Sequence, residues 1–469
     1  MNEQLHKDLI TLDQILEKVK VQGLDYLAKL SERPTSASSA ILLNETLDEM
    51  GLGSMDTLKA FNEKFEKLIV SSSGPRYLGF VIGGTTPASI VGDWLATIYD
   101  QNPQAIKGEG DISAHIEMET IKLLLDLFDL PKDFTGGFVT GATMSNFTCL
   151  ATARQWIGKQ HGKDFARDGV SEQIYILSAS PHSSVIKSLS MLGIGSNNYI
   201  RVKVNSDNRE SIDIEDLKLK IKALKGQPFI LISSAGTVNT VDFDDFKTIS
   251  KLKRNHDFWW HIDGTFGAFA ACSPKYKHLT SGWETADSIT IDCHKWLNVP
   301  YESAIFLVKE QYRSIQTETF QNSNAPYLGD PSEDFNYLNF LPENSRRLKA
   351  LPVWFSLMAY GKKGYRYITE NVVAMANHFG HFIETSNAFE LMAPIRLNNV
   401  CYTLEGEENQ DKVFPFLKNI NETGKVFMTP TVYNGKKGIR ASFVNWRTSK
   451  QDVDMVAKVM IKLISNRVV

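Results

Sequence analysis

Short apolar runs alternate with longer stretches of helical pattern between about residues 138 and 308, and this alternation restricts the possible fold more than any other feature of the chain. It is typical of βα units built around a mostly parallel sheet. In such sheets, ligands bind beyond the carboxyl ends of the strands. The runs are GGFVTG, QIYILS, YIRVKV, PFILISS, FWWHID, SITID and SAIFLV. We therefore predict an α/β fold whose chemistry lies just after these runs.

The pattern changes beyond Leu351, where it indicates helices and a hairpin around Asn434 and Gly435. A strand, GIRASFVNW, follows the hairpin. The next helix is opened by Thr448, with Gln451 three residues on, which is the spacing of a capping box. This region predicts a smaller carboxyl-terminal α+β domain.

The first 30 residues carry an apolar seam at spacings of 4, 3, 4 and 3 residues, which predicts an amphipathic helix. The seam consists of Leu5, Leu9, Leu12, Leu16 and Val19. Such a helix needs a partner surface. The pattern alone leaves open whether that surface belongs to another subunit or to the same chain.

Charge and cysteine content exclude several classes of protein. The chain has 51 Lys and Arg against 54 Asp and Glu, a net charge of −3, and no basic block that would bind nucleic acid or an anionic membrane. Its four cysteines are scattered, which argues against disulfides and a metal site. The start resembles no signal peptide, and 18 apolar residues never run uninterrupted. We expect a cytoplasmic protein with a small-molecule ligand.

Asp263 in FWWHIDG and Lys295 in SITIDCHKW each follow a predicted strand, 32 residues apart. This pair suits pyridoxal phosphate, because a lysine can form the Schiff base while a carboxylate pairs with the pyridinium nitrogen and keeps the ring an electron sink. The alternative interpretation is an ordinary buried ion pair.

A phosphate could bind in the segment GGFVTGATMSNF, where a strand ends at Thr140 and a helix begins near Ser145. The small residues of this turn include Ala142 and Thr143, and a helix amino terminus offers free N–H groups to an anion. The segment lacks the nucleotide-binding patterns GxxxxGK[ST] and GxGxxG.

Three further polar residues follow predicted strands. His182 can stack on a flat cofactor ring, or it can cap the helix that follows it. Thr237, in the turn AGTVNT, can supply a polar contact. His294 adjoins Lys295 and can reach the phosphate.

Together these motifs resemble the group II pyridoxal-phosphate-dependent amino-acid decarboxylases, the family of the aromatic L-amino-acid, histidine and glutamate decarboxylases. The most specific match is DCHKWLNVP, and the other motifs occur in the family's order. The resemblance covers nearly the whole chain, from PRYLGFVIGG to GIRASFVNWRTSKQDVD.

The resemblance implies the aspartate-aminotransferase-like fold type I and a homodimer with active sites at the interface. The chain would then divide into a helical dimerisation segment (1–75), a large cofactor-binding domain (76–351) and a small domain (352–469). Lys295 would form the Schiff base, Asp263 would pair with the pyridinium nitrogen and His182 would stack on the ring. The phosphate-side residues would be Ala142, Thr143 and His294.

Two further matches concern the reaction. NAPYLGD aligns with the family's catalytic loop and places Tyr327 where a tyrosine protonates the substrate carbon, which favours decarboxylation. Arg346, eight residues before Trp354, matches a substrate-binding arginine of some members, although a structural role is equally compatible. The motifs HSS and HKWL favour an aromatic L-amino acid. The alternatives are an acidic amino acid, or an aminotransferase or carbonyl-forming reaction on the same cofactor.

Departures from the family pattern are Thr265 and Ala142, where alanine and glycine are common. His115 lies in a stretch that the family places near the neighbouring subunit's substrate, and it is either a specificity residue or a surface histidine.

Overall fold

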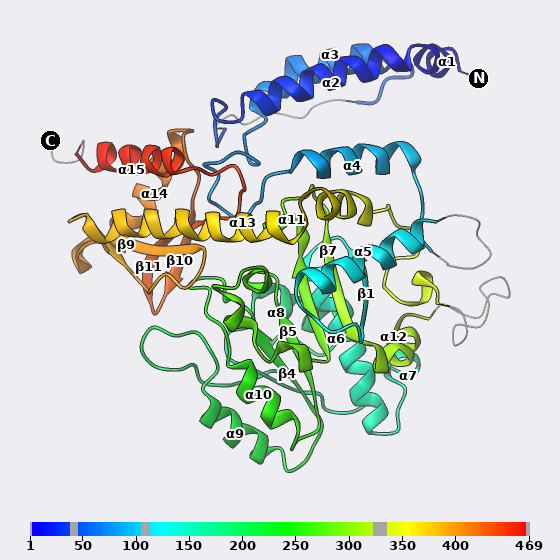
Figure 1. Cartoon of the computed structure of the whole chain (residues 1–469), viewed down its shortest axis with the longest axis vertical. Coiled ribbons are helices and arrows are strands. Elements are labelled where there is room, and N and C mark those ends of the chain that lie inside the picture. The colour runs from blue at the N-terminus through cyan, green and yellow to red at the C-terminus, as the bar shows by residue number, and fades with distance from the viewer. Residues whose placement is uncertain (1, 38–45, 105–111, 322–334, 466–469) are drawn as a thin grey trace.

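The computed structural model describes residues 2–37, 46–104, 112–321 and 335–465, and its centre is a seven-stranded sheet (Figure 1). The strand order is β1-β7-β6-β5-β4-β2-β3, and only β7 runs against its neighbours β1 and β6. The strands are β1 (Phe134–Val139), β2 (Tyr175–Ser178), β3 (Ile200–Arg201), β4 (Phe229–Ser234), β5 (Phe258–Asp263), β6 (Ser288–Asp292) and β7 (Ala304–Lys309). The predicted mostly parallel α/β sheet is confirmed.

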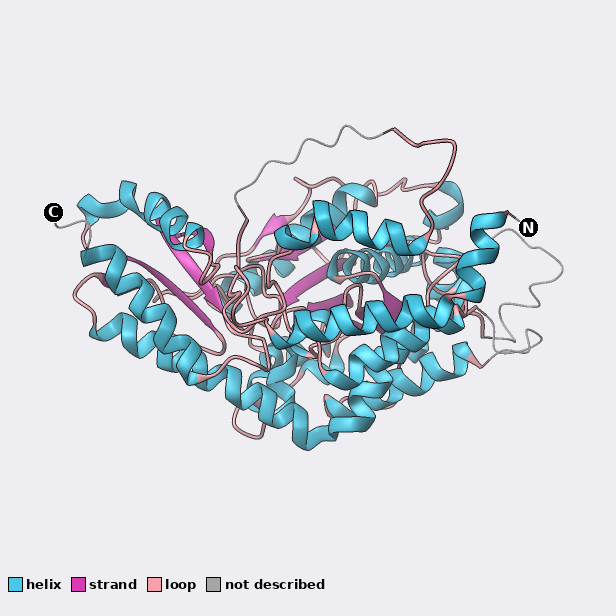
Figure 2. Cartoon of the chain, turned by 90° about the horizontal axis from the view of Figure 1, so that it is seen from above, coloured by secondary structure: helices cyan, strands magenta, loops and turns pink. Residues whose placement is uncertain are grey.

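Helices cover this sheet and connect its strands (Figure 2). Those of the first two-thirds of the chain are α4 (Pro87–Tyr99), α5 (Ser113–Leu127), α6 (Ala142–Gln160), α7 (Phe165–Asp168), α8 (Ser183–Met191), α9 (Ile214–Ala223), α10 (Phe246–Lys253), α11 (Cys293–Trp296) and α12 (Arg313–Phe320). The strand β5 is buried at every position, because it lies in the middle of the sheet with helices on both faces. This explains why FWWHID is apolar almost throughout.

The strand predicted over YIRVKV is much shorter in the structure, where β3 contains only Ile200 and Arg201. It is the last strand of the sheet, and it pairs with β2 alone. Beyond Arg201 the run leaves the sheet, and Val204 instead forms an isolated antiparallel bridge with Ile212.

The carboxyl-terminal region forms a four-stranded antiparallel sheet in the order β10-β11-β9-β8. Its elements are α13 (Ala350–Thr385), β8 (Phe389–Leu391), β9 (Asn399–Leu404), α14 (Val413–Glu422), β10 (Thr429–Tyr433), β11 (Lys436–Ser442) and α15 (Lys450–Ser465). Asn434 and Gly435 form the predicted two-residue turn, both with positive φ, as such hairpins require. The smaller α+β region is thereby confirmed.

The capping box of α15 lies one residue later than the sequence predicted. The Ser449 N–H donates to Asp452 Oδ2, and the Asp452 N–H donates to Ser449 Oγ. The Thr448 hydroxyl instead donates to the Pro75 carbonyl oxygen. The prediction of a cap formed by Thr448 and Gln451 is therefore wrong, because Thr448 joins this helix to the amino-terminal part of the chain.

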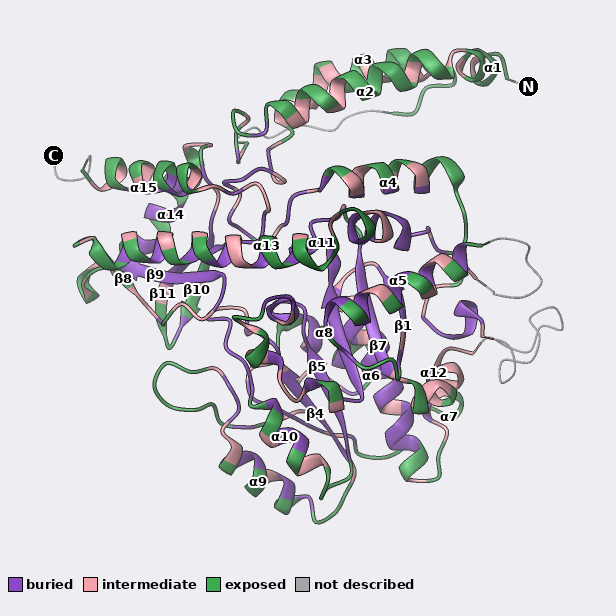
Figure 3. Cartoon of the chain, viewed as in Figure 1, coloured by how far each residue is buried: buried purple, intermediate pink, exposed green. Residues whose placement is uncertain are grey.

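The amino-terminal region contains α1 (Glu3–Ile10), α2 (Leu12–Ala28) and α3 (Ser54–Lys64), which form a layer apart from the sheet (Figure 1). The single predicted helix is divided at Thr11, whose hydroxyl donates to the Lys7 carbonyl oxygen. Hydrogen bonds between Gln22 and Asn62 hold α2 against α3. The apolar seam remains between 40% and 64% exposed, and Figure 3 shows these helices largely in the colour of exposed residues.

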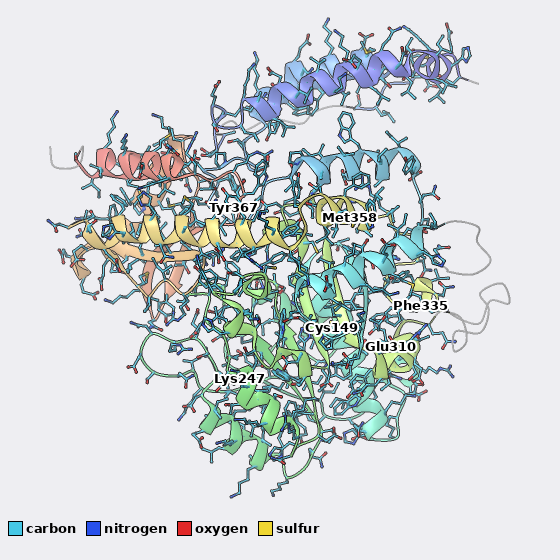
Figure 4. The ribbon with its side chains drawn as sticks, viewed as in Figure 1. Cys149, Lys247, Glu310, Phe335, Met358 and Tyr367 are labelled. Atoms are coloured by element: carbon cyan, nitrogen blue, oxygen red, sulfur yellow. The ribbon has the colours of Figure 1, made fainter. Side chains whose placement is uncertain are left out.

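All four cysteines are buried and unpaired, and Figure 4 labels Cys149, on α6, in the interior beside the sheet. In the same figure, Met358 and Tyr367 mark α13, where both side chains are exposed. Among the described residues, no helix has both the length and the apolar character needed to cross a membrane.

Candidate active site

Asp263 and Lys295 lie at the same edge of the central sheet. Asp263 ends β5, and Lys295 belongs to the one-turn helix α11 that follows β6. These strands are parallel neighbours, with Asp263 opposite Thr290, so their carboxyl ends meet here. The Lys295 Nζ atom lies 3.1 Å from Asp292 Oδ2, at the end of β6. The sheet therefore brings together the two residues that the sequence singled out.

Helix α6 holds the carboxylate of Asp263. Asn146 Nδ2 donates to Asp263 Oδ2 over 3.3 Å, and the Thr265 N–H donates to Asp263 Oδ1 over 3.1 Å. Asp263 is buried, and an ionised carboxylate in such a place needs a positive partner as well as neutral donors. A protonated ring nitrogen fits that requirement.

His261 and Asn146 complete this network, and the sequence analysis missed both. His261 is fully buried, with Nδ1 2.9 Å from Ser288 Oγ and Nε2 2.8 Å from Asn146 Oδ1. Burial lowers the pKa of His261 well below its ordinary value, so the ring is neutral near pH 7. Residues two apart in a strand share a face. That rule, applied to His261 and Asp263, could have found the histidine.

The amino terminus of α6 faces the same edge. Its N-cap residue, Gly141, has no side chain that could cap the first amides, which include those of Ala142 and Thr143. A Cβ atom built on Gly141 would lie 3.5 Å from His294 Cε1, so His294 borders this terminus. The Ser145 hydroxyl donates to Thr290 Oγ1 and anchors the first turn to β6. The arrangement can receive a phosphate at the helix terminus.

His182 precedes α8 and caps it, since His182 Nδ1 accepts a hydrogen bond from the Ser184 N–H over 3.2 Å. Nδ1 also lies 2.8 Å from Ser184 Oγ, which accepts from Asn146 Nδ2. Partial desolvation lowers the pKa of His182, and the positive charge of Lys295 adds to the effect. The capping contact thus connects His182 with the network around Asp263.

Thr237 is buried, and its hydroxyl donates to Glu210 Oε2 over 2.5 Å while accepting from the Asp242 N–H. These contacts order the loop after β4. Thr265, one of the departures from the family pattern, has a buried hydroxyl with no hydrogen-bond partner among the described residues. That hydroxyl is a polar atom at the site that a bound molecule could satisfy.

Arg346 lies outside the network around Asp263. Its Nη1 atom donates to Glu117 Oε1 over 2.9 Å and to the Phe138 carbonyl oxygen, and Nη2 donates to the Pro103 carbonyl oxygen. The side chain is buried. Tyr327 lies outside the described residues. His115 is exposed on α5.

Aromatic side chains extend from His294 along the segment 77–81. The Tyr301 ring lies 4.1 Å from the His294 ring, and Phe427 stacks on Tyr77 at 4.7 Å and contacts Phe80 at 5.7 Å. Tyr301 and Phe80 are exposed. We call these four residues, Tyr77, Phe80, Tyr301 and Phe427, the aromatic wall. No sequence pattern predicts the aromatic wall, because its members come from three separate segments.

The backbone beside the aromatic wall is held in an unusual conformation. Phe80 and Val81 both have positive φ, at 54° and 60°, which is costly for residues with a β-carbon. Two residues on, a Cβ atom at Gly83 would approach the Lys295 carbonyl oxygen to 2.0 Å. The close packing of this segment on α11 fixes the wall relative to Lys295, and such conformations gather at functional sites.

The model of a family described as the pyridoxal-dependent decarboxylase conserved domain matches residues 42–405. An aromatic-L-amino-acid decarboxylase from Bacillus atrophaeus is 28% identical over 94% of this chain and 92% of its own length. Oryza sativa TDC, solved with PLP and tryptamine, shares the fold with a TM-score of 0.89 at 18% identity, over 97% of this chain and 98% of its own. Rhodiola rosea 4-hydroxyphenylacetaldehyde synthase shares the fold with a TM-score of 0.87 at 19% identity, over 98% of this chain and 99% of its own.

Proposed function

The chain belongs to the pyridoxal-dependent decarboxylase family, and we propose that it converts an aromatic L-amino acid into the corresponding amine and carbon dioxide. The resemblance drawn from the motifs is thereby confirmed, as is the fold type. One observation carries the proposal. Asp263, Lys295 and the amino terminus of α6 lie at the same edge of the sheet, and the aromatic wall lies beside them.

Pyridoxal phosphate is the cofactor of this enzyme, and when bound it supplies an electron sink for the pair left by the departing carboxylate. We propose that Lys295 attaches it, that Asp263 holds the proton of its ring nitrogen and that His182 stacks on the ring. The remaining polar contacts to the cofactor would come from Ala142, Thr143, Thr237 and His294. The buried Asn146 and His261 keep the Asp263 carboxylate oriented.

The aromatic wall supports an aromatic substrate. Of its exposed rings, Tyr301 lies against His294, next to Lys295, and Phe80 belongs to the segment whose Gly83 packs on the Lys295 carbonyl oxygen. Flat rings pack well on one another in offset or edge-on contact. The enzyme from Bacillus atrophaeus, which matches nearly the whole chain, is named for aromatic L-amino acids. We infer the same substrate class here.

The contacts of Arg346 bear on the acidic alternative. Glu117 and two carbonyl oxygens occupy its guanidinium, and the side chain is buried. The positive charge of Arg346 is already paired with Glu117, so a second carboxylate beside it would be a buried anion without a cation of its own. Of the two roles that the sequence left open for Arg346, these contacts support the structural one.

We propose further that Tyr327 protonates the substrate carbon that loses carbon dioxide, and that the enzyme is a homodimer. In this proposal residues 1–75 pack on the second subunit, while 76–351 and 352–469 form the large and small domains. The exposed apolar seam of α1 and α2 supports the dimer. The buried, unpaired cysteines are consistent with a cytoplasmic location.

The test is a product screen by mass spectrometry. The full-length protein, loaded with pyridoxal phosphate and given no keto acid, is incubated separately with tyrosine, tryptophan, dihydroxyphenylalanine, glutamate and aspartate. We expect an amine and carbon dioxide from at least one aromatic substrate. Release from glutamate or aspartate alone would refute the aromatic assignment. An aldehyde or a keto acid as the main product would refute decarboxylation to an amine.

A Phe80→Ala variant sharpens the substrate assignment. Loss of this exposed ring should raise KM for the aromatic substrate by about tenfold, as expected for one aromatic contact of about 1 kcal/mol or somewhat more. Phe414→Ala, which removes an exposed ring on α14, is the matched control and should leave KM unchanged. Equal KM values for both variants would remove the aromatic wall from the substrate site.

A further inference from the structure

A second carboxylate, Asp292, touches both functional residues of α11. Its Oδ2 atom lies 3.1 Å from Lys295 Nζ, and its Oδ1 atom lies 3.1 Å from His294 Nε2. Asp292 is the last residue of β6 and is only 2% exposed. The carboxylate is thus enclosed, and its two oxygens face two different side chains.

The contacts of His294 define its tautomer. Its Nδ1 atom accepts a hydrogen bond from the Ser303 N–H over 3.3 Å, so Nδ1 carries no proton. The proton of the ring is therefore on Nε2, where it faces Asp292. One oxygen of Asp292 thus lies beside His294 Nε2, while the other lies beside Lys295 Nζ.

Electrostatics agree with an ionised Asp292. Burial alone would raise the pKa of this carboxyl, but Lys295 and His294 lower it below its ordinary value. The other titratable groups that its charge reaches are His182 at the N-cap of α8, Cys293 on α11 and Tyr301 in the loop after it. Of the groups that lower the pKa of Asp292, Lys295 has the largest effect, so the charge of Asp292 interacts mainly with Lys295 Nζ.

We propose that Asp292 is a positioning residue of the reaction: it holds the Lys295 Nζ atom in place as an ammonium whenever that atom is not joined to the cofactor. The inference rests on the proposed function, because that function makes Lys295 the cofactor-attachment residue. It goes beyond the function in giving the lysine a defined place between attachments. Without Asp292, Nζ would be a partly buried ammonium with no anionic partner among the described residues.

The experiment measures the chemistry of Lys295 without substrate. Full-length protein, freed of pyridoxal phosphate, is labelled with trace acetic anhydride across a pH range, and acetylation of the Lys295 peptide is followed by mass spectrometry. In Asp292→Asn the midpoint of labelling should fall by about 1 to 3 pH units relative to the native protein, because an opposite charge this close stabilises the ammonium. An unchanged midpoint would overturn the proposal.

Two further variants separate positioning from folding. Asp287→Asn alters a buried carboxylate at the other end of the β6 segment, where Asp287 binds Lys253 Nζ over 2.5 Å, and it should not move the Lys295 midpoint. Asp292→Glu keeps the charge and should keep the midpoint within about 0.5 pH units of the native value. Should Asp292→Asn fail to fold, a midpoint in Asp292→Glu lowered by a full unit or more would contradict the proposal.

A second readout follows loading of the enzyme. Attachment of the cofactor needs an unprotonated Nζ, so when pyridoxal phosphate is added to the freed protein, the visible absorption of attached cofactor should appear at lower pH in Asp292→Asn than in Asp292→Glu. Identical spectral titrations would count against Asp292. If labelling shifts as expected but no amino acid loses carbon dioxide, the Asp292 contact stands and the proposed function fails.

Discussion

The sheet edge where Asp263 and Lys295 lie and the amino-terminal helices differ in which side chains they bury. At the sheet edge, Asp263, Asn146 and His261 are buried, and each is hydrogen-bonded to another of the three. In α1, α2 and α3, all of which the structure describes, no residue is buried, and the apolar seam faces outward. In the first region the polar groups find hydrogen-bond partners within the chain, whereas the second region has an apolar surface that a single chain leaves open.

Lys295→Ala tests the sheet edge with the largest expected effect. Amine production should fall by about a thousandfold or more, since removal of one member of a catalytic unit costs about as much as removal of the whole. The visible band of attached cofactor should disappear from the absorption spectrum. Lys458→Ala, an exposed lysine on α15, is the control and should retain both. Persistence of the band in Lys295→Ala would disprove the attachment site.

Arg346→Ala tests how strongly the enclosed region depends on buried charge pairs. The free energy of unfolding should fall by about 3 to 5 kcal/mol, because Glu117 is left as an unpaired buried charge. Arg347→Ala removes a partly exposed partner of Asp93 and should cost about 1 kcal/mol or less. Denaturant titration of both variants measures the difference. If both variants lose the same free energy of unfolding, the buried pair stabilises the fold no more than the exposed pair does.

Asn146→Ala should lower the free energy of unfolding by about 1 to 3 kcal/mol, because Asp263 and His261 each lose a buried partner. It should also weaken binding of pyridoxal phosphate, which fluorescence titration can follow. Asn377→Ala serves as the control, because among the described residues the Asn377 side chain bonds only the Val373 carbonyl oxygen of its own helix. A variant as stable as the control would show that the network is dispensable.

The enclosed histidine predicts a dependence of stability on pH. Burial keeps the pKa of His261 below its ordinary value of about 6.5, so the unfolded chain takes up this proton first as the pH falls. The contribution of His261 is therefore fully present above about pH 6.5 and is lost toward lower pH, at up to about 1.4 kcal/mol per pH unit.

His261→Gln removes that slope, and His378→Gln, a partly exposed histidine paired with Asp454, should keep it. Thermal unfolding at several pH values between 4 and 8 gives the comparison. If His261→Gln retains the native slope below pH 6.5, the histidine is not held neutral in the fold.

Leu16→Asp tests the open region and should have the smallest effect on the fold. Because Leu16 is 45% exposed, the free energy of unfolding of the large domain should change by about 0.5 kcal/mol or less. Self-association, measured by analytical ultracentrifugation, should weaken by about tenfold or more. Gln14→Asp adds the same charge to an exposed position of α2 and should leave association unchanged. A Leu16→Asp variant that unfolds would erase the contrast between the two regions.

Much of the fold could be predicted because periodicity is a local property. The alternation of apolar runs indicated the strands, and the Asn434-Gly435 turn indicated the hairpin, since both positions need positive φ. Boundaries were less accurate. Thr448 looks like a helix cap in sequence, but its hydroxyl is taken by Pro75, 373 residues away. A contact at such separation leaves no local signal.

The candidate site, too, could be predicted only where a residue leaves a local signal in the sequence. Asp263 and Lys295 follow apolar runs, so strand ends pointed to them directly. Asn146 lies inside a helix, and its importance depends on the angle at which α6 crosses β5. The aromatic wall is assembled from segments around residues 77–81, 301 and 427, and no spacing in the sequence connects them. Packing in three dimensions, which periodicity does not encode, determined these parts.

The buried pair of Glu117 and Arg346 also closes the outer side of β1, an edge strand of the central sheet. Glu117 Oε1 accepts from the Phe138 N–H over 2.8 Å, and Arg346 Nη1 donates to the Phe138 carbonyl oxygen. The Tyr337 hydroxyl donates to the Gly136 carbonyl oxygen over 3.3 Å. Side chains thus take the backbone groups that a further strand would use.

The remaining sheet edges are short or interrupted, since β3 has two residues, β8 has three and β10 contains Pro430. Exposed edges are where folded chains pair strand to strand and begin to aggregate. In this chain a neighbour approaching any of these edges meets a side chain, a proline or a strand too short to template pairing. These edges therefore give two copies of the chain little opportunity to pair strand to strand.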